Sequence, residues 1–197
     1  MARPVEFDRD EALEAAMRLF WGQGYVATPV DQLLGAMGIA RSSFYAAFGD
    51  KRSLFVEVLR LFSDRTRAML MEAWSETGTL EAIARFFRST LLEVPRQRAG
   101  RGCLMVNTIL ELAEVDAELS ALASKELARV EAVFEECFAR AQAAGQYPTR
   151  RSATELAAHV MLLNQGLRVA SRKRASRDEL GKQIETALSL LELPGAA

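Results

Sequence analysis

Three side chains in one short stretch of the chain have the chemistry of nucleic-acid contacts. Arg41 can donate two hydrogen bonds to a guanine edge or pair with a phosphate. Ser42 and Ser43 are small, so the backbone can approach closely, and their hydroxyls can serve a base edge or a phosphate. An arginine taken alone is more often a solvated charge than a DNA contact, so the interpretation of Arg41 depends on the elements around it.

Three further residues near this stretch could anchor a phosphate backbone. Tyr45 can reach a phosphate oxygen or pack on a thymine methyl, although an isolated tyrosine is often a partly buried aromatic. Lys51 begins the next expected helix, beside free N–H groups, and can clamp a phosphate. Thr28 is expected to cap a helix that has Pro29 at its first position. The candidate DNA contacts are Thr28, Arg41, Ser42, Ser43, Tyr45 and Lys51.

Two short helices must position these side chains. The first is expected to end at Gly38, and the second is expected over residues 41–48 with Gly49 after it. Apolar residues fall where the two helices must touch. This is the layout of a helix-turn-helix, whose second helix can enter the major groove of DNA. Pairs of short helices also occur in bundles that never touch DNA.

The rest of the chain is predicted to be helical as well. Helix formers dominate, strand-like alternation is missing, and four of the five prolines lie between or outside the periodic segments. Asp8, with Glu11 three residues later, predicts the first N-cap, and Gly22 and Gly24 are expected to stop that helix. The other helices are expected at about 8–21, 51–74, 80–93, 103–113, 116–144, 152–171 and 178–192.

The composition excludes several kinds of site. The chain has 197 residues, one histidine and two cysteines, which leaves no multi-histidine metal site, four-cysteine zinc site or disulfide framework. We expect no catalytic residues, no metal and no cofactor. The N-terminus has no apolar signal region, and no stretch approaches the length of a spanning helix, so we expect a soluble cytoplasmic protein with no membrane partner.

The net charge of −1 means that any attraction to DNA must be local. Residues 1–52 hold six basic and seven acidic side chains. Residues 40–52, in contrast, hold Arg41, Lys51 and Arg52 against Asp50 alone. Positive charge is therefore concentrated where the second short helix meets the next one. This predicts weak non-specific binding and a dependence on contacts from two subunits.

Residues 8–62 resemble the N-terminal domain of the TetR family of transcriptional regulators. The resemblance lies in the run A-x-x-L-F-W-x-x-G-Y-x-A-T from Ala16 to Thr28, then the helix-turn-helix, then F-Y-x-x-F-G-D-K-x-x-L-F from Phe44 to Phe55. The G-C-L-M-V-N-T segment at residues 102–108 is similar to one subset of these regulators. Ala46 and Ala47 depart from the pattern, because His or an aromatic often stands there.

The resemblance implies an all-α fold with a three-helix DNA-binding domain at residues 1–52 and a helical effector-binding and dimerisation domain at 53–197. It implies a homodimer, formed through the last two helices, on a near-palindromic double-stranded operator. The apolar faces of those two helices could instead complete the core of a monomer. A small effector, apolar or electrophilic, would release a repressor by favouring a state that cannot bind DNA, with the fourth helix as the lever.

Six residues are expected to line the effector site, although each is also an ordinary core candidate. Cys103 follows a basic linker and begins a helix, which favours thiolate and suggests a sensor of electrophiles or oxidants. The alternative is a small buried hydrophobe. Cys137 looks structural. The six candidates are Phe87, Cys103, Asn107, Leu110, Phe138 and His159.

Two other functions compete with a ligand-responsive DNA-binding regulator. One is a helical small-molecule-binding protein or enzyme without a DNA role, and the other is a helical adaptor that binds only protein. No nucleophile and base stand at a recognisable spacing, and the sequence contains no Gly-rich phosphate loop. A DNA-binding regulator is therefore the prediction, and the chain is expected not to be an enzyme.

Overall fold

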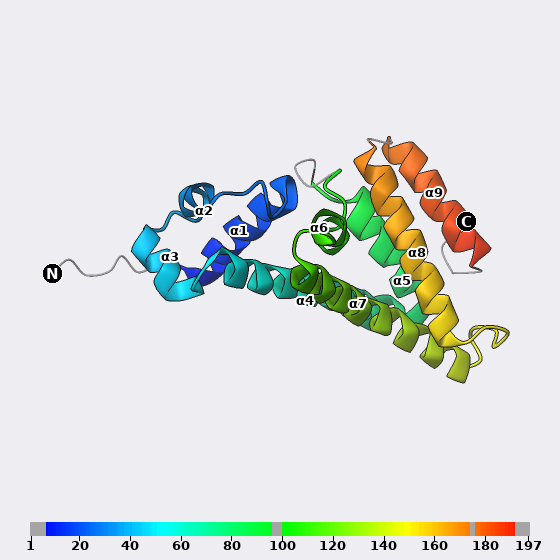
Figure 1. Cartoon of the computed structure of the whole chain (residues 1–197). Coiled ribbons are helices and arrows are strands. Elements are labelled where there is room, and N and C mark those ends of the chain that lie inside the picture. Colours follow the sequence, from blue (N-terminus) through cyan, green and yellow to red (C-terminus); the bar gives the residue numbers. More distant parts are fainter. Residues whose placement is uncertain (1–6, 96–99, 174–175, 192–197) are drawn as a thin grey trace. The chain divides into compact units, whose positions relative to one another are not determined.

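The computed structural model describes residues 7–95, 100–173 and 176–191 (Figure 1). Within these ranges the chain is helical and has no strand, so the predicted all-α class is confirmed. No helix there is both long and apolar enough to cross a membrane. The helices are α1 (Arg9–Gln23), α2 (Val30–Met37), α3 (Arg41–Phe48), α4 (Lys51–Thr77), α5 (Thr79–Phe87), η1 (Arg88–Leu92), α6 (Leu104–Leu112), α7 (Ala117–Ala143), α8 (Ala153–Arg172) and α9 (Arg177–Leu190).

Polar caps fix several helix starts. The Asp8 carboxylate accepts the backbone N–H groups of Asp10 and Glu11 at 2.9 and 3.0 Å, which confirms it as the N-cap of α1. Ser152 and Ser176 form reciprocal capping boxes with the glutamates three residues later. These bonds satisfy N–H groups that a helix start otherwise leaves without a partner.

The chain divides into two compact units that differ from the two predicted domains. One consists of Met1–Ser63 with Leu104–Glu126, and the other of Asp64–Cys103 with Leu127–Ala197. The predicted boundary at residues 52 and 53 falls inside α4. The physical reason is that the first turns of α4 bury Leu54, Phe55 and Val58 in the core of the first unit.

The first unit is held together by side chains from α1, α2, α3, α4, α6 and α7. The Phe20 ring meets the Phe55 ring edge-on, with centroids 4.8 Å apart. Leu104, Leu112 and Leu119 come from a distant part of the sequence and are almost completely buried in the same core. The core that includes the helix-turn-helix is therefore completed by residues from a distant part of the sequence.

The second unit contains α5, η1, α8 and α9, with the remaining parts of α4 and α7. Phe86 and Phe134 meet edge-on in its core, with centroids 5.3 Å apart. The contacting helices α8 and α9 lie side by side (Figure 1). The helix expected over residues 80–93 is in fact α5 followed by the π-helix η1.

Two local predictions about the first helices are wrong. Gly22 lies inside α1, and only Gly24 ends it, with φ of 91°. Thr28 is not the N-cap of α2, because the cap is Pro29 and the helix begins at Val30. The Thr28 hydroxyl instead donates to the Gly24 carbonyl at 2.6 Å. Thr28 therefore closes the loop between α1 and α2.

Candidate nucleic-acid interface

The turn between α2 and α3 has the geometry that a helix-turn-helix requires. Gly38 adopts the left-handed conformation, with φ of 67° and ψ of 29°, and its N–H donates to Leu34. The Ile39 N–H donates to the same carbonyl at 3.2 Å. Leu33 of α2 and Phe44 of α3 have no exposed surface and belong to the same core. The turn and the buried pair leave one face of α3 to the solvent.

That exposed face carries the predicted DNA contacts of α3. Arg41, Ser42 and Tyr45 are exposed, and Ser43 is half-buried. The Tyr45 ring packs edge-on against the buried Phe44 ring, with centroids 5.2 Å apart. This contact orients the Tyr45 side chain on the surface of α3. These four side chains are available to a partner on the surface of α3.

Arg41 is already engaged by a carboxylate that sequence reasoning did not single out. Its guanidinium forms an ion pair with Asp31 on α2, and both side chains are well exposed. Exposed pairs of this kind contribute little to stability, roughly 0–1 kcal/mol. Arg41 can therefore exchange Asp31 for a base or phosphate at small cost.

Lys51 lies against an aromatic ring at the start of α4. Its Nζ is 4.5 Å from the centroid of the Tyr25 ring. Burial lowers the pKa of Lys51 from its ordinary value, and the Glu111 carboxylate opposes that shift. The N-terminus of α4 is not open as expected, because the Ser53 N–H already donates to Asp50 at 2.6 Å. That bond and the Ser53 hydroxyl hold the pKa of Asp50 below its ordinary value.

Thr28, the sixth predicted contact, has no exposed surface. Its hydroxyl is committed to the Gly24 carbonyl, and its N–H donates to Tyr25 at 3.3 Å. In this conformation Thr28 shapes the loop and presents no side-chain atom to a phosphate.

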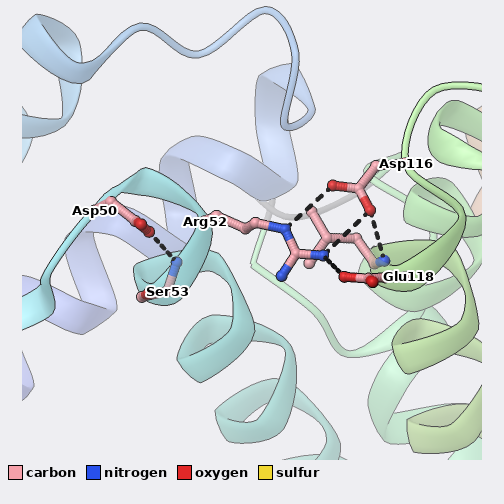
Figure 2. Close-up of polar contacts among 6 residues, drawn as sticks. Asp50, Arg52, Ser53, Asp116 and Glu118 are labelled. Atoms are coloured by element: carbon pink, nitrogen blue, oxygen red, sulfur yellow. Dashed lines mark hydrogen bonds and ion pairs between the residues drawn. The ribbon is translucent and has the colours of Figure 1, made fainter.

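Arg52 is linked to two acids that are more than sixty residues away in the sequence (Figure 2). Its guanidinium donates to Asp116 at 3.3 Å and to Glu118 at 2.6 Å. Asp116 also caps α7 by accepting the Leu119 N–H at 3.0 Å, and this bond, with Arg52, holds the pKa of Asp116 below its ordinary value. The charge of Arg52 is therefore compensated within the first unit.

Glu111 of α6 binds the loop between α1 and α2. Its carboxylate accepts the N–H of Tyr25 at 3.0 Å and the N–H of Val26 at 2.8 Å. Gly24 makes room for it, because a Cβ at that position would lie 2.7 Å from Glu111 Oε2. Sequence reasoning missed Glu111, since nothing local distinguishes an acid on an otherwise apolar helix.

The six predicted effector contacts occupy different surroundings. Phe87, Cys103 and Phe138 are buried in the second unit, and Leu110 of α6 is 74% exposed. Asn107, also on α6, is half-buried. His159 is exposed and lines a cleft of about 460 Å³ in the second unit. The other residues of that cleft are Tyr147, Pro148, Arg150, Arg151, Glu155, Leu156, Leu190 and Leu191.

A cationic group lies near Cys103. The Arg168 guanidinium donates to the backbone and hydroxyl oxygens of Thr90 at 3.0 and 2.8 Å and to Asn164 at 3.3 Å. The bonds to Thr90 join α8 to η1 within the second unit. Burial lowers the pKa of Arg168, and the charge of Cys103 acts in the opposite direction.

Cys103 and Cys137 are both buried free thiols. Burial raises the pKa of Cys137 to about 12, so this thiol is not poised to ionise. Cys103 precedes the first residue of α6, as expected for a residue at a helix start. In the described part of the chain, no group of three or more His, Cys, Asp or Glu side chains is arranged to hold a metal ion.

Two family models match the chain. Residues 12–58 match the model described as bacterial regulatory proteins of the tetR family. Residues 79–187 match the model described as the tetracyclin repressor-like C-terminal domain. Together they cover the helix-turn-helix and most of the second unit.

Curated relatives and solved structures agree with these matches. The chain is 31% identical to the HTH-type transcriptional repressor ComR of Escherichia coli over 190 residues, which is 95% of this chain and 90% of that protein. It is 28% identical to the uncharacterised regulator YezE of Bacillus subtilis, over 98% and 100% of the two chains. A cysteine mutant of the regulator CifR, solved with a 26-bp double-strand operator DNA, has 32% identity, a TM-score of 0.80 and coverage of 96% and 100%.

Proposed function

Because the chain belongs to the TetR family of transcriptional regulators, we propose that it is a repressor released from a near-palindromic operator by a small apolar or electrophilic effector. The family consists of DNA-binding regulators and not enzymes. The protein acts on double-stranded DNA in the cytoplasm as a homodimer. Two copies of α3 enter successive major grooves of the operator.

One observation carries the DNA-binding part of the proposal. The exposed face of α3 presents Arg41, Ser42 and Tyr45 on a helix fixed by the buried Phe44. The CifR structure with operator DNA, 32% identical over nearly the whole chain, supports assigning that face to DNA. Arg41 reads a base edge, while Ser42, Ser43, Tyr45 and Lys51 contact phosphates or base edges. Thr28 serves by shaping the loop.

Exposed apolar side chains on the last two helices support dimerisation there. Leu162 and Val169 of α8 are 66% and 45% exposed, and Leu190 of α9 is 81% exposed. Gly166 lies between the two α8 residues, and a Cβ built on it would meet nothing within 4 Å. Apolar surface with a small residue in it suits close packing against a second copy in a four-helix bundle.

The effector part of the proposal centres on the second unit. Cys103 is buried in the second unit, near the Arg168 guanidinium. An electrophilic effector would form a covalent bond to that sulfur. An apolar effector would instead displace packing around Phe87 and Phe138.

An electrophoretic shift with the DNA upstream of the protein's own gene tests the function. We expect a sequence-selective complex that weakens steeply with salt and is lost on adding the effector. The effector screen should include quinones, aldehydes and peroxide beside neutral apolar compounds. Absence of any selective, salt-sensitive complex would refute the DNA-binding role.

Cys103→Ser separates the two effector classes. If the effector is electrophilic, the variant keeps its operator affinity and no longer releases DNA with quinones, aldehydes or peroxide. Cys137→Ser is the matched control and should release DNA as the wild type does. Release that is unchanged in Cys103→Ser would leave the apolar effector as the proposal.

A further inference from the structure

We propose that Glu111 is a positioning residue for DNA binding, which holds the loop before α2 and thereby the aromatic support under Lys51. Glu111 lies on α6, far in sequence from the helix-turn-helix, yet both belong to the first compact unit. The proposal rests on Lys51 contacting a phosphate, and the experiment below tests that step separately.

The Glu111 carboxylate is matched to two donors. It accepts one N–H from Tyr25 at 3.0 Å and one from Val26 at 2.8 Å, each with a different oxygen. Bonds from backbone N–H groups to a carboxylate are among the stronger hydrogen bonds in proteins. Two neighbouring residues of the loop are thus fixed by one side chain.

The loop is also built to receive this carboxylate. Gly24 ends α1 with φ of 91°, a conformation that side chains other than glycine rarely adopt. An ideal Cβ on Gly24 would lie within 2.9 Å of three atoms of the Glu111 carboxyl group. The close approach of carboxylate and backbone therefore depends on glycine at this position.

The same loop carries the ring on which Lys51 lies. The Tyr25 ring is 4.8 Å from the Phe55 ring and 6.1 Å from the Phe20 ring, centroid to centroid, so it bridges the core and the surface. The ammonium group of Lys51 lies over the same ring, 4.5 Å from its centroid. Fixing the Tyr25 backbone through Glu111 thus fixes the surface that orients Lys51.

A positioning role and a purely electrostatic role of Glu111 predict opposite changes in operator affinity when this residue is replaced. Removing an acid from a DNA-binding protein reduces repulsion from phosphates and should tighten binding. Glu111→Gln removes the charge and places an amide donor where one of the two N–H groups needs an acceptor. We expect it to weaken operator binding by roughly tenfold.

The matched control is Glu114→Gln. Glu114 follows α6, is exposed, and carries the same charge. Its replacement should leave operator affinity unchanged or raise it slightly. Affinity is measured by fluorescence anisotropy with the operator at several salt concentrations, on full-length protein whose helicity and dimeric state match the wild type.

The salt dependence distinguishes positioning from a general loss of stability. Lys51→Ala should reduce the slope of log affinity against log salt by about one. Glu111→Gln should reduce the slope similarly, and the double variant should bind no more weakly than Lys51→Ala alone. Glu111→Asp, which is too short to reach both N–H groups, should show the same pattern and replaces Glu111→Gln if that variant does not fold.

Two results would overturn the proposal. One is operator affinity and salt slope in Glu111→Gln equal to those of Glu114→Gln. The other is a loss of affinity in Glu111→Gln that adds fully to that of Lys51→Ala. If Lys51→Ala itself leaves the slope unchanged, the assigned phosphate contact is wrong. If the wild type binds no operator, the proposed function fails instead.

Discussion

Arg41 is held by an acid of its own chain before any DNA arrives. The Arg41–Asp31 pair joins α3 to α2 at the solvent surface, where water and salt weaken it. A guanine edge offers the same guanidinium two acceptors in one plane. If Arg41 reads a base as proposed, we expect exchange of Asp31 for that base to cost little free energy.

Arg41→Ala should reduce the sequence selectivity of DNA binding, whereas Lys51→Ala should reduce the affinity for DNA in general. Loss of a bidentate base contact lowers discrimination between operator and mutated operator, by roughly tenfold at the base pair that Arg41 reads. Loss of a phosphate contact weakens all sequences about equally. Competition binding with a set of single-base operator variants measures both effects. Unchanged selectivity in Arg41→Ala would refute the base-reading role.

Lys51 and Arg52 are neighbours in sequence but differ in their surroundings. Arg52 has two carboxylate partners, which together with hydrogen bonding raise the pKa of its guanidinium (Figure 2). Lys51 lies on a ring instead. Because the charge of Arg52 is compensated, the positive charge over residues 40–52 is smaller in the folded chain than the sequence alone suggests. Arg41 and Lys51 supply the remaining positive charge of this segment.

At the scale of the elements, helix boundaries follow from local chemistry. The capping box of α9 is an example: the Ser176 N–H and hydroxyl lower the pKa of Glu179 below its ordinary value of 4.5. A carboxyl group whose pKa is lowered in the folded state stabilises the fold above its unfolded pKa. That contribution is lost as the pH falls through the folded value.

Glu179→Gln should therefore lower the free energy of unfolding at neutral pH. The difference in free energy of unfolding between the variant and the wild type should become smaller as the pH drops below about 4.5. Urea unfolding midpoints at pH 7 and at pH 3 measure this difference. Glu185→Gln on the same helix, where no cap is present, is the control. A difference that stays constant across this range would contradict the role of the cap.

The sequence predicted the helix ends that depend on neighbouring residues. It did not predict contacts between residues that are far apart in the chain. Gly38 and Gly49 ended α2 and α3 where expected, because a glycine after a helix acts through its own φ. The π-helix after α5 was missed, and its Thr90 carbonyl accepts a hydrogen bond from Arg168, which is 78 residues away. Glu111 was missed for the same reason, because its partners are 85 and 86 residues away.

At the scale of the whole molecule, the near-neutral net charge predicts that one copy binds DNA weakly. With a net charge of −1, long-range attraction to DNA is small. In a dimer, binding of one recognition helix holds the other at a high effective concentration near its half-site. The dimer then binds more tightly than one copy, although each helix makes the same contacts. If the proposed homodimer forms, we therefore expect operator binding to depend on it.

Leu162→Glu should convert the dimer to a monomer and weaken operator binding by roughly 100-fold or more. The change puts a charge on the exposed apolar face of α8, where it would be buried against a second copy. Analytical ultracentrifugation and anisotropy measure the two effects. Leu110→Glu, at an equally exposed leucine of α6, is the control for the oligomeric state. A Leu162→Glu protein that stays dimeric would place the interface elsewhere.

The first compact unit is assembled from two separated parts of the chain, which bears on its synthesis. When residue 63 has been made, its core still lacks Leu104, Leu112 and Leu119, and its second segment ends only at residue 126. At ordinary elongation rates this falls roughly 3–12 s after residue 63. During that interval the helix-turn-helix has its own sequence but an incomplete core. A nascent chain should therefore acquire DNA-binding competence late, and a fragment ending at residue 63 should not acquire it at all.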